Sequence, residues 1–439
     1  MKGKPVRITR RAFSTGATSI APLLVSRHIL GDQNNAAANE KISLAAIGVG
    51  KMMYDFHLPH FVKMPDVKVV AVCDVDTTRR NAGKKRVDDA YGNHHCASYV
   101  DYRDLLQRND LDAVVCATPD HWHANIILDT CQAGKDMYCE KPLTNNLAEA
   151  KMVLDAVNAS EIIFQTGSQQ RANTNFRYAC ELVRNGYIGK VIRVEVGVGG
   201  PPRTCDLPGE DAEPGLDWDR WLGPAPMRPY NSELSPRGMH DHFPNWRSFK
   251  EYAGGGMTDW GAHHFDIAQW GLGMDKSGPV EIVPPHDAKS RTGVKFIYDN
   301  GAELIHGGRE GITFYGSDGK IFVNRGRLES KPESIIQSTI GEDEIHLYRS
   351  PGNSHAGHRQ DWVNCLKQRR QPNCPIEIGA RTVAVCHLGN LAYLHAEELA
   401  GKTLKWDPKT WNFIGDYSAA NRWKNYPYQR REGYQLPSI

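Results

Sequence analysis

The stretch KISLAAIGVGKMMYDFHLPHF, residues 41 to 61, decides the fold of this chain. A short apolar run from Ile42 to Ile47 leads into Gly48-Val49-Gly50 and then into a segment that can open a helix. Strand, glycine turn and helix in this order are typical of the first unit of a dinucleotide-binding sheet, although a lone Gly-x-Gly also occurs in ordinary tight turns. The usual pattern places a third small residue where Met53 stands. We expect Met53 to require local repacking of helix against strand without abolishing the site.

Length and composition narrow the class of protein. A chain of 439 residues exceeds one typical core and predicts two domains. Its hydrophobic content of 40% and charged content of 24% are ordinary for a globular protein, and a net charge of +2 provides no basic face for nucleic acid. No apolar run approaches the roughly 20 residues that cross a bilayer. Ten cysteines without a CxxC pair or zinc spacing are interpreted as buried reduced thiols.

The first residues have the features of an export signal. Thr9-Arg10-Arg11-Ala12-Phe13 has the twin-arginine pattern, a mildly apolar stretch follows, and Ala36-Ala37-Ala38 forms a small-residue cleavage site. We therefore predict a signal peptide over residues 1–38, a mature chain from about Asn39, and a periplasmic or otherwise exported protein with no membrane attachment after signal removal. The alternative is a disordered tail with two chance arginines.

The rest of the chain divides by texture into two α/β parts. Strand-like and helix-like segments alternate over residues 39–164, which predicts a doubly wound parallel sheet. Residues 165–439 contain alternating strands and turn residues, among them Asp299-Asn300-Gly301 and Ser317-Asp318-Gly319. They predict a second domain with a large, mostly antiparallel sheet. No internal repeat is visible.

Several single elements are predicted as well. A helix is expected over Thr77–Tyr91, and a buried strand over Ala113–Ala117. Residues 343–350, DEIHLYRS, have the alternation of a strand. The stretch 201–250 is rich in Pro, Trp and Arg, and we interpret it as long surface loops.

Acidic, polar and basic residues follow the predicted parallel strands at the edge where such sheets bind ligands. Asp74 closes the second strand, where an acid can bind a ribose hydroxyl and repel a 2′-phosphate, so NAD is favoured over NADP even though Arg79 and Arg80 follow. The segment from Thr118 lies beyond the third strand, although a helix start with a Pro-Asp cap explains it equally well. Residues expected to border the cofactor are Gly48, Gly50, Lys51, Met52, Asp74, Thr118, Pro119, His121, His123, Glu140, Lys141 and Gln169.

A second group of chemically capable residues lies in GGGMTDWGAHHFDIAQW, residues 254 to 270. On a helix, Asp259, His263 and Asp266 share one face, so a carboxylate one turn before a histidine can orient the ring and support its charged form. His264 projects about 100° away and is expected to be structural. The alternative is a capped core helix with satisfied histidines.

Together these motifs resemble the Gfo/Idh/MocA oxidoreductase family, named for glucose-fructose oxidoreductase, inositol dehydrogenase and a rhizopine-catabolism protein. The motifs that carry the resemblance, from about Lys41 to the C-terminus, are Gly48-Val49-Gly50, Asp74, Thr118-Pro119 with His123, Glu140-Lys141-Pro142, and Asp259 with His263. Residues 261–273 and 404–416 resemble its exported, twin-arginine branch. The resemblance implies an N-terminal Rossmann domain, a C-terminal domain with an open sheet that makes a homo-oligomer, and a cis bond before Pro142.

The resemblance also implies a reaction. We expect an NAD(P)-dependent oxidoreductase that oxidises a secondary alcohol of a sugar, polyol or glycoside. His263 would remove the hydroxyl proton, Asp259 would orient the imidazole, and Lys141 would donate a hydrogen bond to the same oxygen. Because free NAD is scarce outside the cytosol, an exported enzyme should hold its cofactor tightly.

Substrate binding is assigned to loops of the second domain. Arg171, His240, His242, Trp246 and Arg247 are candidates for a sugar subsite beside His263, with solvated loop residues as the equal alternative. A metal pair at His240 and His242 is the alternative, but no metal is expected. Two rival functions remain: a redox-assisted, NAD-dependent glycosidase or lyase, and a secreted carbohydrate-binding protein with a vestigial cofactor pocket.

Overall fold

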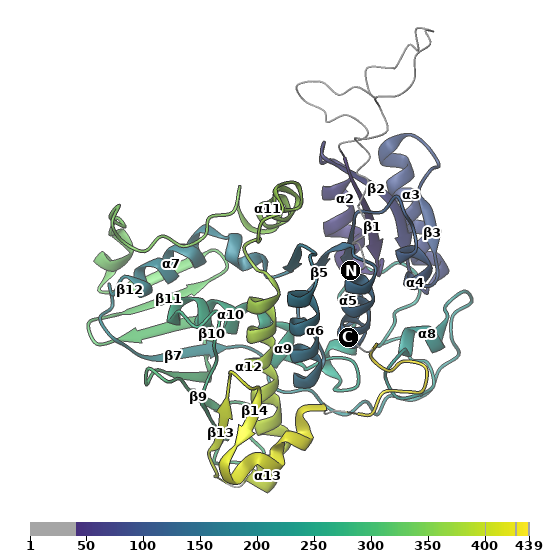
Figure 1. Cartoon of the computed structure of the whole chain (residues 1–439). Coiled ribbons are helices and arrows are strands. Elements are labelled where there is room, and N and C mark those ends of the chain that lie inside the picture. Colours follow the sequence, from purple (N-terminus) through teal and green to yellow (C-terminus); the bar gives the residue numbers. More distant parts are fainter. Residues whose placement is uncertain (1–40, 400, 426–427, 438–439) are drawn as a thin grey trace, which may run out of the picture. The chain divides into compact units, whose positions relative to one another are not determined.

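The apolar runs of the first part form a six-stranded parallel sheet in the computed structural model, which describes residues 41–399, 401–425 and 428–437 (Figure 1). The sheet has the order β3-β2-β1-β4-β5-β6, and every pair in it is parallel. Its strands are β1 (Ile42–Ile47), β2 (Val67–Cys73), β3 (Ala97–Tyr99), β4 (Ala113–Cys116), β5 (Asp136–Cys139) and β6 (Phe164–Thr166). The predicted doubly wound sheet is confirmed. The signal peptide predicted over residues 1–38 lies outside the described residues.

Helices connect these strands, as right-handed parallel crossovers require. They are α2 (Leu58–Phe61), α3 (Thr77–Tyr91), α4 (Tyr102–Leu106), η3 (Asp120–Trp122), α5 (His123–Gln132) and α6 (Leu147–Ala159). The predicted helix over Thr77–Tyr91 is confirmed. Its ends follow from capping, because the Asp76 carboxylate accepts hydrogen bonds from two backbone N–H groups of the first turn and Gly92 ends the helix in the left-handed conformation.

The segment after the glycine turn opens as a π-helical turn, η2 (Met52–His57), instead of an α-helix. Met53 is fully buried there among Val49, Val72 and Val87. A third glycine would let the helix pack closely on the strand, whereas the wider π turn leaves room for a long side chain. The local repacking expected at Met53 is therefore present.

The second sheet has eight strands in the order β12-β11-β10-β9-β8-β13-β14, and β7 also pairs with β10. These strands are β7 (Val191–Gly197), β8 (Glu281–Val283), β9 (Lys295–Ile297), β10 (Glu303–Gly316), β11 (Lys320–Asn324), β12 (Arg327–Lys331), β13 (Leu404–Asp407) and β14 (Asn412–Ile414). All its pairs are antiparallel. Turns at residues 299–301 and 317–319 connect β9 to β10 and β10 to β11, as predicted.

Helices α7, α10 and α12 pack on the second sheet, and Figure 1 shows α10 and α12 close to its strands. The helical elements of this part are η4 (Gln169–Ala172), α7 (Thr174–Arg184), α8 (Trp218–Leu222), η5 (Asn245–Ser248), α9 (Gly256–Asp259), α10 (Gly261–Leu272), η6 (Glu333–Gln337), α11 (Ser354–Gln368), α12 (Ile376–Leu394), α13 (Ala396–Leu399) and η7 (Gly415–Asn425). One apolar cluster joins side chains of both sheets, such as Val114 and Phe296. The chain from Ile42 onward packs as one compact unit.

Two predictions about the second part are wrong. Residues 343–350 form no strand, because the backbone N–H groups of Ile345 and Leu347 donate to the side chains of Asn185 and Glu181 instead of to a neighbouring strand. The stretch 201–250 is also more than surface loops. Its side chains Trp221, Leu222, Trp246 and Phe249 form a buried apolar cluster of their own together with Tyr252.

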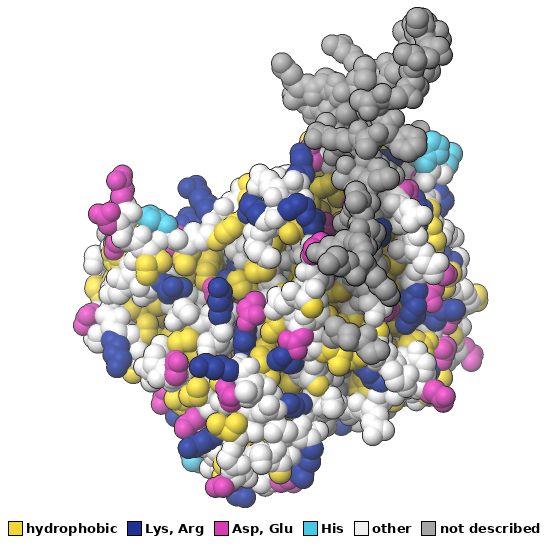
Figure 2. Space-filling view, in the orientation of Figure 1, with side chains coloured by type: hydrophobic (Ala, Val, Ile, Leu, Met, Phe, Trp, Pro, Cys, Tyr) yellow, Lys and Arg dark blue, Asp and Glu magenta, His cyan; other side chains and the backbone are white. Residues whose placement is uncertain are grey.

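The state of the cysteines and the mixture of surface charges in the described residues are those expected from the composition. All ten cysteines are free, and most are buried, as predicted. Lysine and arginine are interspersed with aspartate and glutamate on the face seen in Figure 2. Within the described ranges, no helix combines the length and apolar character needed to span a membrane.

Candidate functional site

The glycine turn after β1 has the geometry that makes glycine necessary. Gly48 has φ +81°, and a Cβ there would lie 2.8 Å from the backbone nitrogen of Thr118. A Cβ on Gly50 would meet no atom within 4 Å, so that position faces open space. The turn is held from β2, because the backbone N–H of Val49 donates to Asp74 Oδ2 at 2.6 Å.

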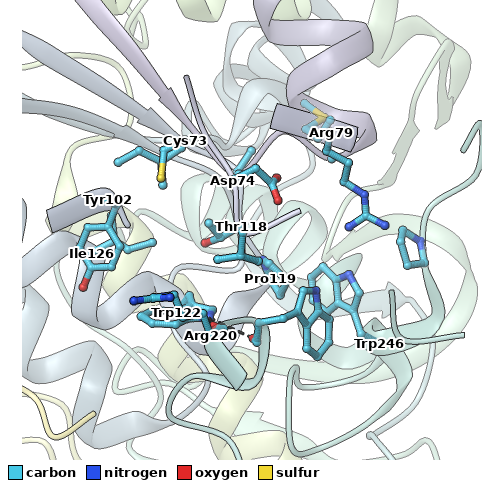
Figure 3. Close-up of a pocket in the computed structure, with 18 of the residues that line it drawn as sticks. Cys73, Asp74, Arg79, Tyr102, Thr118, Pro119, Trp122, Ile126, Arg220 and Trp246 are labelled. Atoms are coloured by element: carbon cyan, nitrogen blue, oxygen red, sulfur yellow. Dashed lines mark hydrogen bonds between the residues drawn. The ribbon is translucent and has the colours of Figure 1, made fainter. Parts of the chain in front are cut away.

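A cavity of about 360 Å³ lies at the carboxyl ends of β1, β2 and β4, where the strand order reverses. This switch point is where doubly wound sheets bind dinucleotides. Seven residues predicted to border a cofactor line it: Gly48, Gly50, Lys51, Met52, Asp74, Thr118 and Pro119. Figure 3 shows Asp74 between Arg79 and Thr118, with Tyr102 and Ile126 at one end of the cavity and Trp246 at the other.

Segments far along the chain close the other side of this cavity. They contribute Arg220, Trp221, Leu234, His240, Phe243, Trp246, Arg247 and Tyr434. The final described segment returns to this place because Arg431 donates to Asp219 and the Tyr434 ring packs on Trp122 at 5.6 Å. Among these residues only His240, Trp246 and Arg247 were predicted, and only as substrate residues. No local pattern in the sequence marks the others.

The two arginines after Asp74 are engaged with protein groups. Arg79 donates to the Ser235 hydroxyl at 3.1 Å and to the Pro236 carbonyl oxygen, and it is buried. Arg80 donates to the carbonyl oxygen of Asp74 at 2.7 Å. Burial raises the pKa of Asp74, although the Arg79 charge and two backbone N–H donors oppose that rise.

Lys141 and Asp259 join the two parts of the molecule next to the cavity. Lys141 Nζ donates to Asp259 Oδ1 at 2.7 Å and to the Asp259 carbonyl oxygen at 3.0 Å. Arg247, which lines the cavity, lies 3.9 Å from Asp259 Oδ1. Burial opposes ionisation of Asp259, but the Lys141 and Arg247 charges keep its pKa below the usual value. The bond between Lys141 and Pro142 is cis, as the family resemblance implied.

His263 lies close to this pair but is not oriented by it. Helix α9 ends at Asp259 and α10 begins at Gly261, so the two side chains do not share one regular helical turn. The expected orientation of the imidazole by the Asp259 carboxylate is not observed, because Asp259 accepts from Lys141, and His263 Nδ1 has no partner among the described residues. Burial and then the Lys141 and Arg325 charges put the pKa of His263 well below its usual value, so the ring is neutral.

Glu140 belongs to a buried chain of contacts beneath Lys141. Its Oε1 lies 2.9 Å from His57 Nε2, and Arg359 Nε donates to His57 Nδ1 at 3.0 Å. His57 therefore accepts at Nδ1 and donates at Nε2. Burial opposes ionisation of Glu140, but the His57 hydrogen bond and the Lys141 charge lower its pKa to about 2.

Three predicted cofactor residues support the site from behind and do not line the cavity. His121 is buried with Nε2 3.0 Å from the Trp221 carbonyl oxygen. The His123 ring nitrogens lie 2.8 Å from the Pro142 carbonyl oxygen and 3.0 Å from that of Thr118, so this ring links the two loops. Gln169 is buried beside His355. Sequence reasoning assigned these residues from proximity along the chain, which does not reveal side-chain direction.

Asp120, which was not among the predicted site residues, lies within the same group of charges. Its carboxyl group is buried, and burial raises its pKa to about 7 despite the charges of His123, Arg247 and Lys141. The carboxyl group therefore titrates near neutral pH at the edge of the site. A Pro-Asp helix start in the sequence conceals this environment, because the burial comes from segments distant along the chain.

Arg171 is not a substrate residue in this structure. Its guanidinium group is 2% exposed and pairs with Asp266 at 2.8 Å and with Asp275 at 2.7 Å. Asp266, expected to share a face with His263, therefore has a structural partner. His240 lines the cavity, whereas His242 is exposed, and within the described chain no group of three metal-ligating side chains includes either residue.

Fold and site define a class of protein: a Rossmann-type dinucleotide-binding enzyme whose second α/β part adds polar groups beside the cofactor cavity. The chain belongs to the Gfo/Idh/MocA oxidoreductase family. Residues 42–168 match its NAD-binding Rossmann-fold domain, and residues 203–434 match its C-terminal alpha/beta domain.

Similarity to individual proteins is lower. Myo-inositol 2-dehydrogenase of Thermotoga maritima is 24% identical over 65% of this chain and 75% of its own length. An alpha-N-acetylgalactosaminidase of Shewanella oneidensis is 28% identical over only 42% of this chain and 40% of its own length. The solved aldose-aldose oxidoreductase from Caulobacter crescentus superposes with TM-score 0.57 at 18% identity, over 83% of this chain and 99% of that one, which shows the common fold.

Proposed function

We propose that this protein is an NAD-dependent oxidoreductase that oxidises a secondary alcohol of a sugar, polyol or glycoside. The observation that carries the proposal is the convergence of Lys141, from the end of the parallel sheet, with Asp259 and His263 of the second part beside a dinucleotide cavity. Relatives named as sugar or inositol oxidoreductases support the substrate class.

The described residues fit a dinucleotide. Gly50 faces open space where a backbone can approach a pyrophosphate, and Asp74 stands where a ribose hydroxyl binds. Arg79 and Arg80 already donate to protein groups, which supports NAD over NADP. When bound, the nicotinamide supplies the acceptor for a hydride.

In the proposed step, a neutral His263 accepts the hydroxyl proton of the substrate as the carbon loses its hydride, so that a carbonyl group forms. Lys141 donates a hydrogen bond to the same oxygen and stabilises its developing negative charge. Asp259 orients Lys141, a corrected role that follows from their pairing. General acid–base catalysis of this kind contributes roughly 10²–10⁴-fold to the rate.

Retention of the cofactor is also proposed. The cavity is bounded on one side by the parallel sheet and on the other by residues such as Trp221, Trp246 and Tyr434, and contacts on both sides would slow the release of a dinucleotide. Tight retention suits a protein exported by the twin-arginine route to the periplasm, which we propose for residues 1–38 on their Arg10-Arg11 motif. We also propose a homo-oligomer. Export that survives replacement of both arginines by lysine would contradict the signal, and a monomer in light scattering would contradict the oligomer.

The purified protein tests the central proposal directly. Mild denaturation should release NAD and not NADP, and a panel of sugars and glycosides should reduce the bound nicotinamide, followed by its absorbance. A protein that releases no nicotinamide and binds none when NAD is added would contradict the proposal and support the vestigial carbohydrate-binding alternative.

The partial similarity to an alpha-N-acetylgalactosaminidase favours one second candidate, a redox-assisted glycosidase or lyase on the same fold. Product analysis separates the two functions. An oxidoreductase yields a keto sugar with the glycosidic bond intact, whereas the alternative yields a cleaved bond with no net oxidation.

A further inference from the structure

A second cavity, of about 620 Å³, lies beside the catalytic candidates and has no part in the proposed step. Its polar and aromatic lining comes from Trp260, His264, Thr292 and Glu310, and backbone of residues 197–199 and 307–308 completes it. Its volume is in the range of small-molecule sites. None of these residues lines the dinucleotide cavity.

Trp260 connects this cavity to the reaction site. It is the residue between α9 and α10, directly after Asp259, and it is 40% exposed, which is unusual for so large an apolar side chain. The indole ring lies 5.9 Å from the ring of His263 and 5.9 Å from that of His264. The Arg325 guanidinium group stacks over it at 4.7 Å. A ligand against Trp260 would therefore lie next to the His263 ring.

His264 contributes a hydrogen-bond donor without a partner. Arg325 Nε donates to Gln170 Oε1 at 3.1 Å, and Gln170 Nε2 donates to the His263 carbonyl oxygen at 3.2 Å, so the Gln170 amide can be oriented in only one way. The same Nε2 lies 3.2 Å from His264 Nδ1, which must then accept. The proton of the neutral ring is therefore on Nε2. His264 is fully buried, and Nε2 has no partner among the described residues.

A buried N–H without a partner is costly in a folded protein. His264 lines the cavity but is fully buried, so a ligand oxygen can accept from Nε2 only if the ring turns towards the cavity. Burial and the Arg325 charge lower the pKa of His264 to about 3, so the ring stays neutral at physiological pH. Near it, the Thr292 hydroxyl both donates and accepts, and the Glu310 carboxylate accepts. An apolar aromatic surface surrounded by donors and acceptors matches a carbohydrate ring, which presents C–H groups on its face and hydroxyls at its edge.

We propose that this cavity binds a second sugar ring, so that the substrate of the reaction is a disaccharide or larger glycoside and not a free monosaccharide. In this arrangement the reacting ring lies at Lys141 and His263, and the non-reacting ring stacks on Trp260. This inference rests on the proposed function for its reaction but not for its binding site, and the sequence had predicted His264 to be purely structural.

Isothermal calorimetry on the full-length protein with its cofactor tests the site, with methyl glucoside and methyl galactoside against maltose, cellobiose and lactose. We expect at least one disaccharide to bind about tenfold more tightly than its monosaccharide, a difference of ~1.4 kcal/mol. Trp260→Ala should abolish that advantage and leave monosaccharide binding unchanged, and Trp260→Phe should restore part of it. Ile414→Ala, an exposed apolar change at the β14 edge of the sheet, is the matched control and should change neither affinity.

If Trp260→Ala does not fold, Thr292→Val and Glu310→Gln at the exposed rim of the cavity replace it in the test. Each variant should weaken the binding of disaccharides and leave the binding of monosaccharides unchanged. Equal affinity for both sizes of sugar in the unmodified protein, or equal weakening of both in a variant, would overturn the subsite. A disaccharide advantage without any reduction of bound nicotinamide would uphold the subsite and defeat the proposed function. Reduction of the bound nicotinamide by monosaccharides and disaccharides alike, with equal affinity for both, would uphold the proposed function and defeat the subsite.

Discussion

Two ion pairs hold the helical segment that runs through α9 and α10, one with Lys141 of the first part and one with Arg171 of η4, and they differ in what surrounds them. Lys141 pairs with Asp259 at 2.7 Å, and the two side chains are 14% and 24% exposed. Arg171 pairs with Asp266 at 2.8 Å, with exposures of 2% and 0%. In the sequence, the two aspartates belong to one predicted helical face.

The difference shows that burial decides whether an ion pair can contact a ligand or only stabilises the fold. The carboxylate of Asp266 is saturated, because it also accepts from the Thr382 hydroxyl at 3.1 Å, and no substrate can reach it. Lys141 and Asp259 keep solvent access beside Arg247 and the cofactor cavity, so the same kind of contact remains available to a ligand. A charge pair that is only partly buried can exchange partners during a reaction.

The largest expected effect tests the open pair. Lys141→Met should lower turnover by about 10²–10⁴-fold, because the alkoxide loses its hydrogen-bond donor, while cofactor content stays unchanged. Turnover is measured by reduction of the bound nicotinamide. Lys141→Arg, which keeps the charge near Asp259, is the control for pairing alone and should retain stability better than activity. Unimpaired turnover in Lys141→Met would show that the pair of Lys141 and Asp259 has no role in catalysis.

The buried pair should respond in the opposite way. Arg171→Met leaves the Asp266 carboxylate buried without its cation, which should lower the free energy of unfolding by about 3–5 kcal/mol. Urea denaturation measures this. Arg171→Met combined with Asp266→Leu removes both charges and should recover much of the loss. A stable Arg171→Met protein with abolished turnover would instead return Arg171 to the substrate site.

Glu140 is buried beneath the site, and the stability that its hydrogen bond with His57 contributes depends on pH. Its folded-state pKa of about 2 is below the ordinary glutamate value of about 4.3, so its hydrogen bond from His57 stabilises the fold above that value. The contribution is lost as the pH falls from about 4.3 towards 2. Glu140→Gln should therefore cost about 2 kcal/mol at pH 7 and flatten the acid limb of a plot of unfolding free energy against pH. Parallel acid limbs in the two proteins would contradict this account.

The smallest expected effect is on the stability contributed by the open pair. Asp259→Asn should lower the free energy of unfolding by about 1 kcal/mol at pH 7, because solvent screens a partly exposed pair. Since the pKa of Asp259 is lowered in the folded protein, the difference in unfolding free energy should be complete above pH about 3.9 and disappear as the pH falls further. Thermal denaturation across pH measures it. A loss as large as that of Arg171→Met would show that the two pairs do not differ.

Sequence patterns predicted much of the first part and less of the second. The parallel sheet, the helix Thr77–Tyr91 and the turns at 299–301 and 317–319 follow from local periodicity and turn chemistry, and the structure confirms them. Residues 343–350 have strand alternation, but their backbone N–H groups donate to the side chains of Asn185 and Glu181. His121 and His123 were correctly placed after a strand end, but their side chains contact backbone carbonyl groups of the protein. The spacing of residues along the chain does not reveal the direction of a side chain.

The glycine turn, the acid after β2 and the lysine after β5 could be predicted from sequence, because each depends on a few neighbours along the chain and on strand order. The pairing of Asp259 with Lys141, the saturation of Asp266 by Arg171, and the closure of the cofactor cavity by segments near 220, 246 and 434 become visible only in the folded chain. The physical reason is that burial and partner choice depend on groups distant along the chain, and these decide whether a charged side chain is held fixed or remains free to react.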